Sequence, residues 1–130
     1  MKKILVILRG APSAGKSSFA ELLGKAICSA DDWYTRKGVY NWDVRYLNEA
    51  HIWCERKCWR FMQKDVSPII IANTNVTERI MRPYIDMAKE FGYIVYFVVL
   101  ENRHGNKNSH NVPEETIEKM KNRLMNSIKL

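Results

Sequence analysis

The stretch Ile4–Leu23, ILVILRGAPSAGKSSFAELL, combines an apolar run, a short glycine- and lysine-containing loop and an amphipathic segment. The near-continuous apolar run over residues 3–9 has the length of one strand and the composition of a strand buried on both faces of a parallel sheet. Four apolar residues after the loop recur at the spacing of one helix stripe: Phe19, Leu22, Leu23 and Ala26. We therefore predict a strand over residues 3–9 and a helix over residues 16–26.

The loop between them, Gly10–Ser17, fits the pattern G-x-x-x-x-G-K-[ST] without a mismatch. Gly10 and Gly15 permit backbone angles and a close approach that a side chain would block, so the loop amides can point at phosphate oxygens. Lys16 can reach the outer phosphates of a nucleotide, and the Ser17 hydroxyl can ligate magnesium. The alternative is a glycine-rich turn that only joins the strand to the helix.

The motif predicts that the chain binds a nucleoside triphosphate together with Mg2+. ATP is favoured over GTP, because no segment of the chain resembles a guanine-reading N-K-x-D sequence. The motif residues expected to bind the nucleotide are Gly10, Ser13, Ala14, Gly15, Lys16, Ser17 and Ser18, and Ser17 is also the expected metal ligand.

The composition is that of a folded globular protein, with 46% hydrophobic and 27% charged residues in a chain of 130. This length predicts a single domain over residues 1–130, and the longest apolar runs are too short to span a bilayer. The net charge of +7 attracts polyanions and favours a nucleic-acid partner, although the same charge can serve solubility alone.

Three cysteines, in no spacing typical of a disulfide framework, predict reduced thiols in a cytoplasmic protein. His51, Cys54 and Cys58 share one face of an expected helix, and this spacing suits either a metal site or a buried stripe. Because no fourth ligand is evident in the sequence, we predict that these side chains pack in the core.

The rest of the chain alternates between strand-like and helix-like segments. Strands are expected over residues 27–30, 68–72 and 93–100, and helices are expected to begin at Asp43, at Asn75 or Thr77, and at Pro113. We expect Gly92 to end the second of these helices, Pro83 to mark a kink or a late start in it, and residues 35–41 to form a loop. The alternation predicts an α/β fold of the P-loop NTPase type, three-layer α/β/α, with a central, mainly parallel sheet of four or five strands.

Asp31 and Asp32 directly follow the second expected strand. Ligands of such sheets bind at the carboxyl ends of the strands, so a carboxylate here would lie near the phosphate-binding loop. It could accept the proton of an attacking hydroxyl, or one of the pair could instead cap the following turn. Four aromatic residues flank this region and could stack on bases or pack in the core: Trp33, Tyr34, Tyr40 and Trp42.

The polar segment Glu101–Val112, ENRHGNKNSHNV, follows the last expected strand and carries Arg103 and Lys107. A mobile basic loop at this place can close as a lid over phosphates and neutralise developing charge. The alternative is a solvated surface loop, and we expect His104 and His110 to be surface residues in either case.

Four segments, MKKILVILRGAPSAGKSSFA, SADDWY, IIIANTN and RHGNKNSHNVPEETIEKM, together resemble the P-loop 5′-hydroxyl polynucleotide kinases of phage RNA and DNA repair and related small AAA and P-loop ATP-binding proteins. The resemblance covers nearly the whole chain. It implies that Asp31 is the general base for the 5′-hydroxyl, that Lys16 and Ser17 bind phosphate and magnesium, and that Arg103 contacts the ATP phosphates. Lys107 falls where a second lid arginine is usual.

Three positions depart from the pattern of that family. Asn73 or Ala72 stands where an aspartate usually precedes Thr-Asn, which keeps hydrogen bonding but loses a charge. Tyr34 stands where an arginine grips the acceptor phosphate, and Arg36 is out of register. Lys107 offers a point charge in place of a forked guanidinium.

These features favour an ATP-dependent kinase acting on the 5′-hydroxyl end of RNA or DNA, with Lys16, Asp31 and Arg103 as catalytic residues. One alternative is a kinase for a small acceptor such as a nucleoside or a sugar. The other is an ATP-binding adaptor or switch with little transfer activity, which the departures at Asn73 and Tyr34 motivate.

Overall fold

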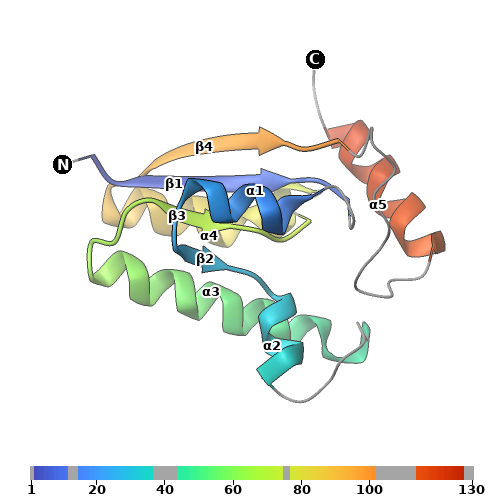
Figure 1. The fold of residues 1–130 in the computed structure, drawn as a ribbon, viewed down its shortest axis with the longest axis horizontal. Coiled ribbons are helices and arrows are strands. Elements are labelled where there is room, and N and C mark those ends of the chain that lie inside the picture. Colours follow the sequence, from blue (N-terminus) through green and yellow to red (C-terminus); the bar gives the residue numbers. More distant parts are fainter. Residues whose placement is uncertain (1, 12–14, 37–43, 75–76, 102–113, 128–130) are drawn as a thin grey trace.

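The computed structural model describes residues 2–11, 15–36, 44–74, 77–101 and 114–127. Its centre is a sheet of four parallel strands in the order β2-β3-β1-β4 (Figure 1). The strands are β1 (Ile4–Arg9), β2 (Ala26–Cys28), β3 (Ile69–Ile71) and β4 (Ile94–Val99). The predicted parallel sheet is confirmed, and β1, which carries the motif loop at its end, lies inside it.

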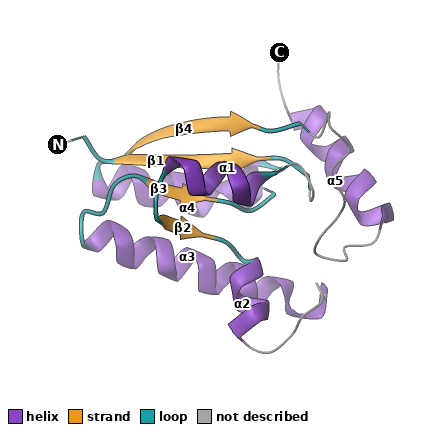
Figure 2. Ribbon diagram, in the orientation of Figure 1, coloured by secondary structure: helices purple, strands orange, loops and turns teal. Residues whose placement is uncertain are grey.

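Helices cover both faces of the sheet (Figure 2). They are α1 (Lys16–Leu23), α2 (Asp31–Arg36), α3 (Leu47–Gln63), α4 (Glu78–Phe91) and α5 (Glu114–Ser127), and a 3-10 turn, η1 (Val44–Tyr46), precedes α3. One face of the sheet packs against α1, and the other packs against α3 and α4. The three-layer α/β/α architecture predicted from the sequence is therefore present, and no described helix is long and apolar enough to cross a membrane.

The side chains of β1 alternate between the two layers. Leu5 and Ile7 join the core beneath α3 and α4, whereas Val6 and Leu8 face α1. Each fully buried aliphatic side chain contributes about 1.5–3 kcal/mol relative to an exposed one. Two buried faces explain why the residues from Ile4 to Leu8 are all apolar instead of alternating with polar residues.

The helix after the motif loop is shorter than predicted, because α1 ends at Leu23 and Ala26 already belongs to β2. The predicted apolar stripe is wrong at Leu22 and Leu23, which are 84% and 38% exposed, and Ala20 is the fully buried residue of this helix. Gly24 explains the early end: an added Cβ there would lie 3.2 Å from side-chain atoms of Ile70 and Pro68, so the turn packs tightly on the core.

Other element boundaries also differ from the predictions. The second strand covers Ala26–Cys28 instead of residues 27–30, and the following α2 was not predicted, since residues 35–41 were expected to form a loop. The next helix, α3, begins only at Leu47, after η1; Asp43 lies outside the described residues. Gly92 ends α4 in the left-handed conformation (φ 75°), as predicted.

Pro83 lies inside α4, and Thr77 takes the N-cap position without a side-chain hydrogen bond to the helix. The other predicted cap, Asn75, lies outside the described residues. The last predicted helix is present as α5, which begins directly after Pro113.

Candidate active site

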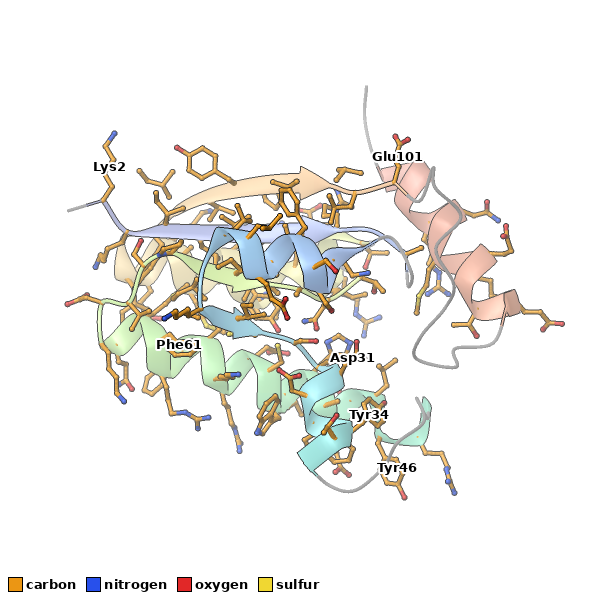
Figure 3. The ribbon with its side chains drawn as sticks, in the orientation of Figure 1. Lys2, Asp31, Tyr34, Tyr46, Phe61 and Glu101 are labelled. Atoms are coloured by element: carbon orange, nitrogen blue, oxygen red, sulfur yellow. The ribbon has the colours of Figure 1, made fainter. Side chains whose placement is uncertain are left out.

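The carboxyl ends of three neighbouring strands are joined by backbone hydrogen bonds. The Gly10 amide, after β1, donates to the Thr74 carbonyl, after β3, at 3.0 Å, and the Ala72 amide donates to the Cys28 carbonyl at 2.9 Å. Figure 3 shows Asp31 at this same edge, where α2 begins, and Lys2 at the opposite edge of the sheet. The motif loop and the aspartate pair therefore meet at one edge of the sheet, as expected for a parallel sheet.

The described part of the motif loop presents a helix N-terminus. Gly15 has a left-handed backbone (φ 88°) and precedes α1, whose first helical hydrogen bond runs from the Phe19 amide to the Gly15 carbonyl at 3.1 Å. The amides of Lys16, Ser17 and Ser18 therefore have no partner within the helix, and such amides bind anions. The motif residues Ser13 and Ala14 lie outside the described residues.

Lys16 lies within the loop. Its Nζ donates to the carbonyl oxygens of Gly10 at 2.8 Å and Ala11 at 2.9 Å. Burial lowers the pKa of Lys16 to about 8, and the nearby Asp31 carboxylate opposes this shift. An ammonium that binds loop carbonyls is in place to exchange those oxygens for phosphate oxygens. The exposed Ser17 follows on the first turn of α1, so the donor set fits a phosphate chain with a magnesium ion.

Asp31 is the first residue of α2 and is half-buried, whereas Asp32 is exposed. The amide of Asp31 donates to Ser29 Oγ at 3.3 Å. The Asp31 carboxylate lies close enough to act on the pKa of both Lys16 and His51. Of the two aspartates, Asp31 is therefore the one that lies beside the motif loop.

The environment of Asp31 is fixed by Asn73, which is 6% exposed. Asn73 Oδ1 accepts a hydrogen bond of 2.7 Å from the Ala30 amide, one residue before Asp31. Its Nδ2 donates to the Tyr84 hydroxyl at 3.4 Å and to Cys54 Sγ at 3.5 Å. Asn73, one of the positions that depart from the family pattern, thus connects the turn after β2 to α3 and α4.

The neighbours of Asn73 remain uncharged at neutral pH. Burial raises the pKa of Cys54 to about 12 and also raises the pKa of Tyr84. The Asn73 amide therefore contacts a neutral thiol and a neutral phenol. A carboxylate at position 73 would lie buried beside this neutral thiol and neutral phenol and could not donate to them, whereas the amide both accepts from the Ala30 amide and donates to Tyr84 and Cys54.

His51 is a site residue whose position the sequence did not reveal. Burial lowers the pKa of His51, which keeps the ring neutral at pH 7, while the Asp31 carboxylate opposes the shift. His51 and Asp31 are 20 positions apart in the sequence, and they meet because α2 packs on α3. The proximity of His51 and Asp31 could be identified only from the packing of α2 on α3.

The other part of the His51, Cys54, Cys58 pattern belongs to the core, as predicted: both cysteines are fully buried. Within the described residues no group of three His, Cys, Asp or Glu side chains could hold a metal ion. Trp33 and Tyr34 are also core residues, 7% and 4% exposed, and their rings meet edge to face at 5.3 Å. Their predicted alternative role, stacking on bases, does not fit this burial.

Several predicted site residues lie outside the described part of the chain. They are Arg103, His104, Lys107 and His110 of the expected lid, together with the aromatic residues Tyr40 and Trp42. Their predicted roles stay predictions.

A profile of the family described as an AAA domain matches residues 5–126, which is nearly the whole chain. The chain belongs to this AAA domain family. Human NEDD4-binding protein 2 is 40% identical over 99 residues, which make up 72% of this chain. The matched region is 6% of the human protein, so the likeness concerns one part of a much longer molecule.

Solved structures show the same fold. A chain of the Pnkp1/Rnl/Hen1 RNA repair complex superposes with a TM-score of 0.72 at 20% identity, over 97% of this chain and 45% of that one. A cysteine-to-alanine variant of the APS kinase CysC from Mycobacterium tuberculosis gives a TM-score of 0.50 at 11% identity, over 95% and 98% of the two chains. The chain therefore shares the fold of these two solved structures.

Proposed function

We propose that this domain transfers the γ-phosphoryl group of ATP to the 5′-hydroxyl end of an RNA or DNA strand. The observation that carries the proposal is the position of Asp31. A carboxylate lies beside Lys16 at the mouth of a phosphate-binding loop, at the edge of the sheet where ligands bind. A P-loop alone does not separate a kinase from a hydrolase, but a carboxylate placed to take up a proton favours transfer to a hydroxyl.

In the proposed step, the acceptor oxygen attacks the γ-phosphorus of ATP and forms a new P–O bond. The bond between the γ-phosphorus and its bridging oxygen breaks, and ADP leaves with that oxygen. The hydroxyl proton passes to the Asp31 carboxylate. Asp31 must therefore be ionised and within reach of the acceptor, a position that the bond between Asn73 and the Ala30 amide supports.

The nucleotide side supplies charge. Lys16 would leave the Gly10 and Ala11 carbonyls to bind the β- and γ-phosphates, and the amides that begin α1 would add further donors. The Ser17 hydroxyl would hold a magnesium ion, which would supply further positive charge to the phosphate chain. We assign Arg103 and Lys107 to a lid over residues 101–112 that closes on the phosphates, within one kinase domain over residues 1–130.

The net charge of the chain and its similarity in fold to a protein of an RNA repair complex support the proposal of a polynucleotide acceptor. A net charge of +7 favours a polyanionic acceptor over a neutral nucleoside. A chain of the same fold belongs to an RNA repair complex. The resemblance of the four sequence segments to polynucleotide kinases points to the same acceptor.

The test is transfer of labelled γ-phosphate from ATP to 5′-hydroxyl oligonucleotides of RNA and of DNA, with 5′-phosphorylated strands as the control. We expect label on the 5′-hydroxyl strands only. Excess nucleoside that competes, where oligonucleotide does not, would instead identify a small-molecule kinase. Tight ATP binding without transfer to any acceptor, unchanged in Asp31→Ala, would indicate an adaptor or switch.

A further inference from the structure

The outer surface of α3 carries a dense group of cations. Arg56, Lys57, Arg60 and Lys64 lie on the last turns of α3 and at its C-cap, and no acidic residue follows Glu55 in the helix. Arg56, Arg60 and Lys64 are exposed and Lys57 is half-buried. Figure 3 shows nitrogen-tipped side chains that point from α3 away from the sheet. We call these four residues the basic face of α3.

No ion pair among the described residues neutralises the charge of this face. In the part of the chain that the structure describes, the ion pairs are Lys3–Asp65 and Glu78–Arg82, and neither includes a residue of the basic face. Arg60 lies four positions from both Arg56 and Lys64, and like charges at this spacing destabilise a helix. The helix dipole compensates only near the last turn. An external anion would relieve the remaining repulsion.

Aromatic rings lie among these cations. The Lys57 ammonium lies 5.4 Å from the ring centroid of Trp53 and 6.0 Å from that of Phe61. Trp59 is 42% exposed, although it meets the Phe91 ring edge to face at 6.2 Å. Cations that follow a backbone, beside aromatic rings on which bases stack, are the features with which proteins bind single-stranded nucleic acid.

The direction of α3 connects this face to the candidate active site. The helix begins beside α2, where His51 lies near Asp31. It then runs to the opposite edge of the sheet, where Figure 3 shows Phe61 on the same side of the molecule as Lys2. Its 17 residues span about 25 Å, which is long enough for several nucleotides.

We propose that the acceptor strand lies along α3, with its 5′ end at Asp31, its phosphates on Arg56, Arg60 and Lys64, and a base against Trp59. The placement of the 5′ end rests on the proposed kinase function, whereas the binding of a single strand to this face does not. Charge complementarity favours this occupant: the four residues of the basic face are all cations and lie beside aromatic rings, which suits a polyanion with stacking bases.

The binding test uses the full chain as Asp31→Ala, so that no turnover occurs. A fluorescent single-stranded 12-mer is titrated at several salt concentrations, before and after the double change Arg56→Gln with Arg60→Gln. The matched control changes two exposed cations on other helices, Lys89→Gln with Arg123→Gln, and removes the same net charge. Both variants replace exposed side chains, and thermal unfolding verifies that each remains folded.

We expect the α3 double variant to bind roughly tenfold more weakly at low salt and to reduce the slope of log K against log salt by about 1.4, which is two phosphate contacts on a single strand. The control should change the slope much less. Trp59→Ala should weaken binding by roughly tenfold at every salt concentration, because stacking is not screened. Equal losses in the two double variants, or no binding by the parent protein, would overturn the proposal.

A kinetic measurement separates this inference from the proposed function. In the wild-type background, the α3 double variant should raise KM for a 12-mer acceptor much more than KM for a dinucleotide acceptor, whereas the control Lys89→Gln with Arg123→Gln should leave the kcat and KM for both acceptors unchanged. Absence of transfer to every acceptor would remove the kinase proposal while the binding test still decides the role of α3. If wild type and the α3 double variant both transfer phosphate normally and have the same KM for the 12-mer, only the proposal about α3 is refuted.

Discussion

The two sides of the candidate active site are built in different ways. The nucleotide side comes from one continuous stretch, in which Gly15 and Lys16 act through backbone conformation and loop carbonyls. The acceptor side joins Asp31, His51 and Asn73 from the ends of β2 and β3 and from α3. A local sequence motif suffices for the first side, whereas the second exists only when the core has packed.

This difference has a consequence for mutations. A change on the nucleotide side should alter ATP binding directly, because in the proposed complex the phosphates would contact that loop. A change on the acceptor side should leave ATP binding intact and alter the transfer step or the stability of the fold, because Asn73 and its neighbours connect α3 and α4 to the turn before Asp31.

The largest expected effect compares the two sides directly. Lys16→Ala should weaken ATP binding and reduce turnover, because the ammonium is lost from the phosphates. Asp31→Ala should reduce turnover by about 10²- to 10⁴-fold, the usual contribution of a general base, and leave the Kd for ATP nearly unchanged. Calorimetric titration with ATP and single-turnover kinetics measure the two quantities. If Asp31→Ala weakens ATP binding as much as Lys16→Ala does, the separation of the two sides is wrong.

A smaller effect is expected from Asn73→Ala, which leaves the Ala30 amide without its acceptor. An unsatisfied buried donor costs about 1–3 kcal/mol, so the free energy of unfolding should fall by that amount. Turnover should fall while ATP affinity stays constant. Tyr84→Phe is the control, since it removes the hydroxyl that contacts Asn73 Nδ2 and Cys54 but leaves the Ala30 amide its acceptor and keeps the ring in the core. Chemical denaturation at fixed temperature gives the free energy of unfolding of each variant. If Tyr84→Phe lowers it as much as Asn73→Ala does, the prediction is contradicted.

The pH dependence concerns the nucleotide side alone. The pKa of Lys16 is lowered from 10.5 to about 8 in the folded protein, so between these values the unfolded state binds more protons and stability rises with pH. Phosphate binding favours the charged ammonium, so ATP binding above pH 8 should take up a proton and weaken by at most about tenfold per pH unit. Calorimetry in two buffers of different ionisation enthalpy measures the uptake. Lys16→Ala should abolish it; uptake that persists in this variant would exclude Lys16 as its source.

The smallest effect is expected at Ser29, whose Oγ accepts the 3.3 Å hydrogen bond from the Asp31 amide. Ser29→Ala should lower the free energy of unfolding by about 1 kcal/mol, as for the loss of a capping hydroxyl, and lower turnover only a few-fold. Ser29→Thr, which keeps the hydroxyl, should restore both. A loss of turnover as large as that of Asn73→Ala would show that the acceptor side depends on the serine and not mainly on the asparagine.

Much of the fold could be predicted because its signals are local. Within β1 the run from Ile4 to Leu8 is apolar at every position since both faces of the strand are buried, and Gly92 ends α4 because its backbone is left-handed. The errors occurred where tertiary packing decided the outcome. Leu22 fits a helical stripe but is exposed, because the turn at Gly24 packs against Ile70 and Pro68 and ends α1 early.

The site divides in the same manner. The motif loop and Asp31 were identifiable from spacing, since the carboxyl ends of parallel strands share one edge. The roles of His51 and Asn73 were not, because a histidine on a helix and an asparagine after a strand carry no local signal of what they contact. The burial of these two side chains determined their contacts, and residue type alone does not indicate whether a histidine or an asparagine is buried.

By itself, the sequence determined the parallel sheet, the helix that follows the glycine loop and the amides that this helix presents, because backbone conformation and apolar spacing act over short distances. Only the tertiary structure decided that Asn73 holds the turn before Asp31, that His51 lies near this carboxylate, and that Trp33 and Tyr34 are buried. These contacts join residues far apart in the chain. They exist because burial of the apolar faces of α3 and α4 brings the polar groups on those helices to fixed positions.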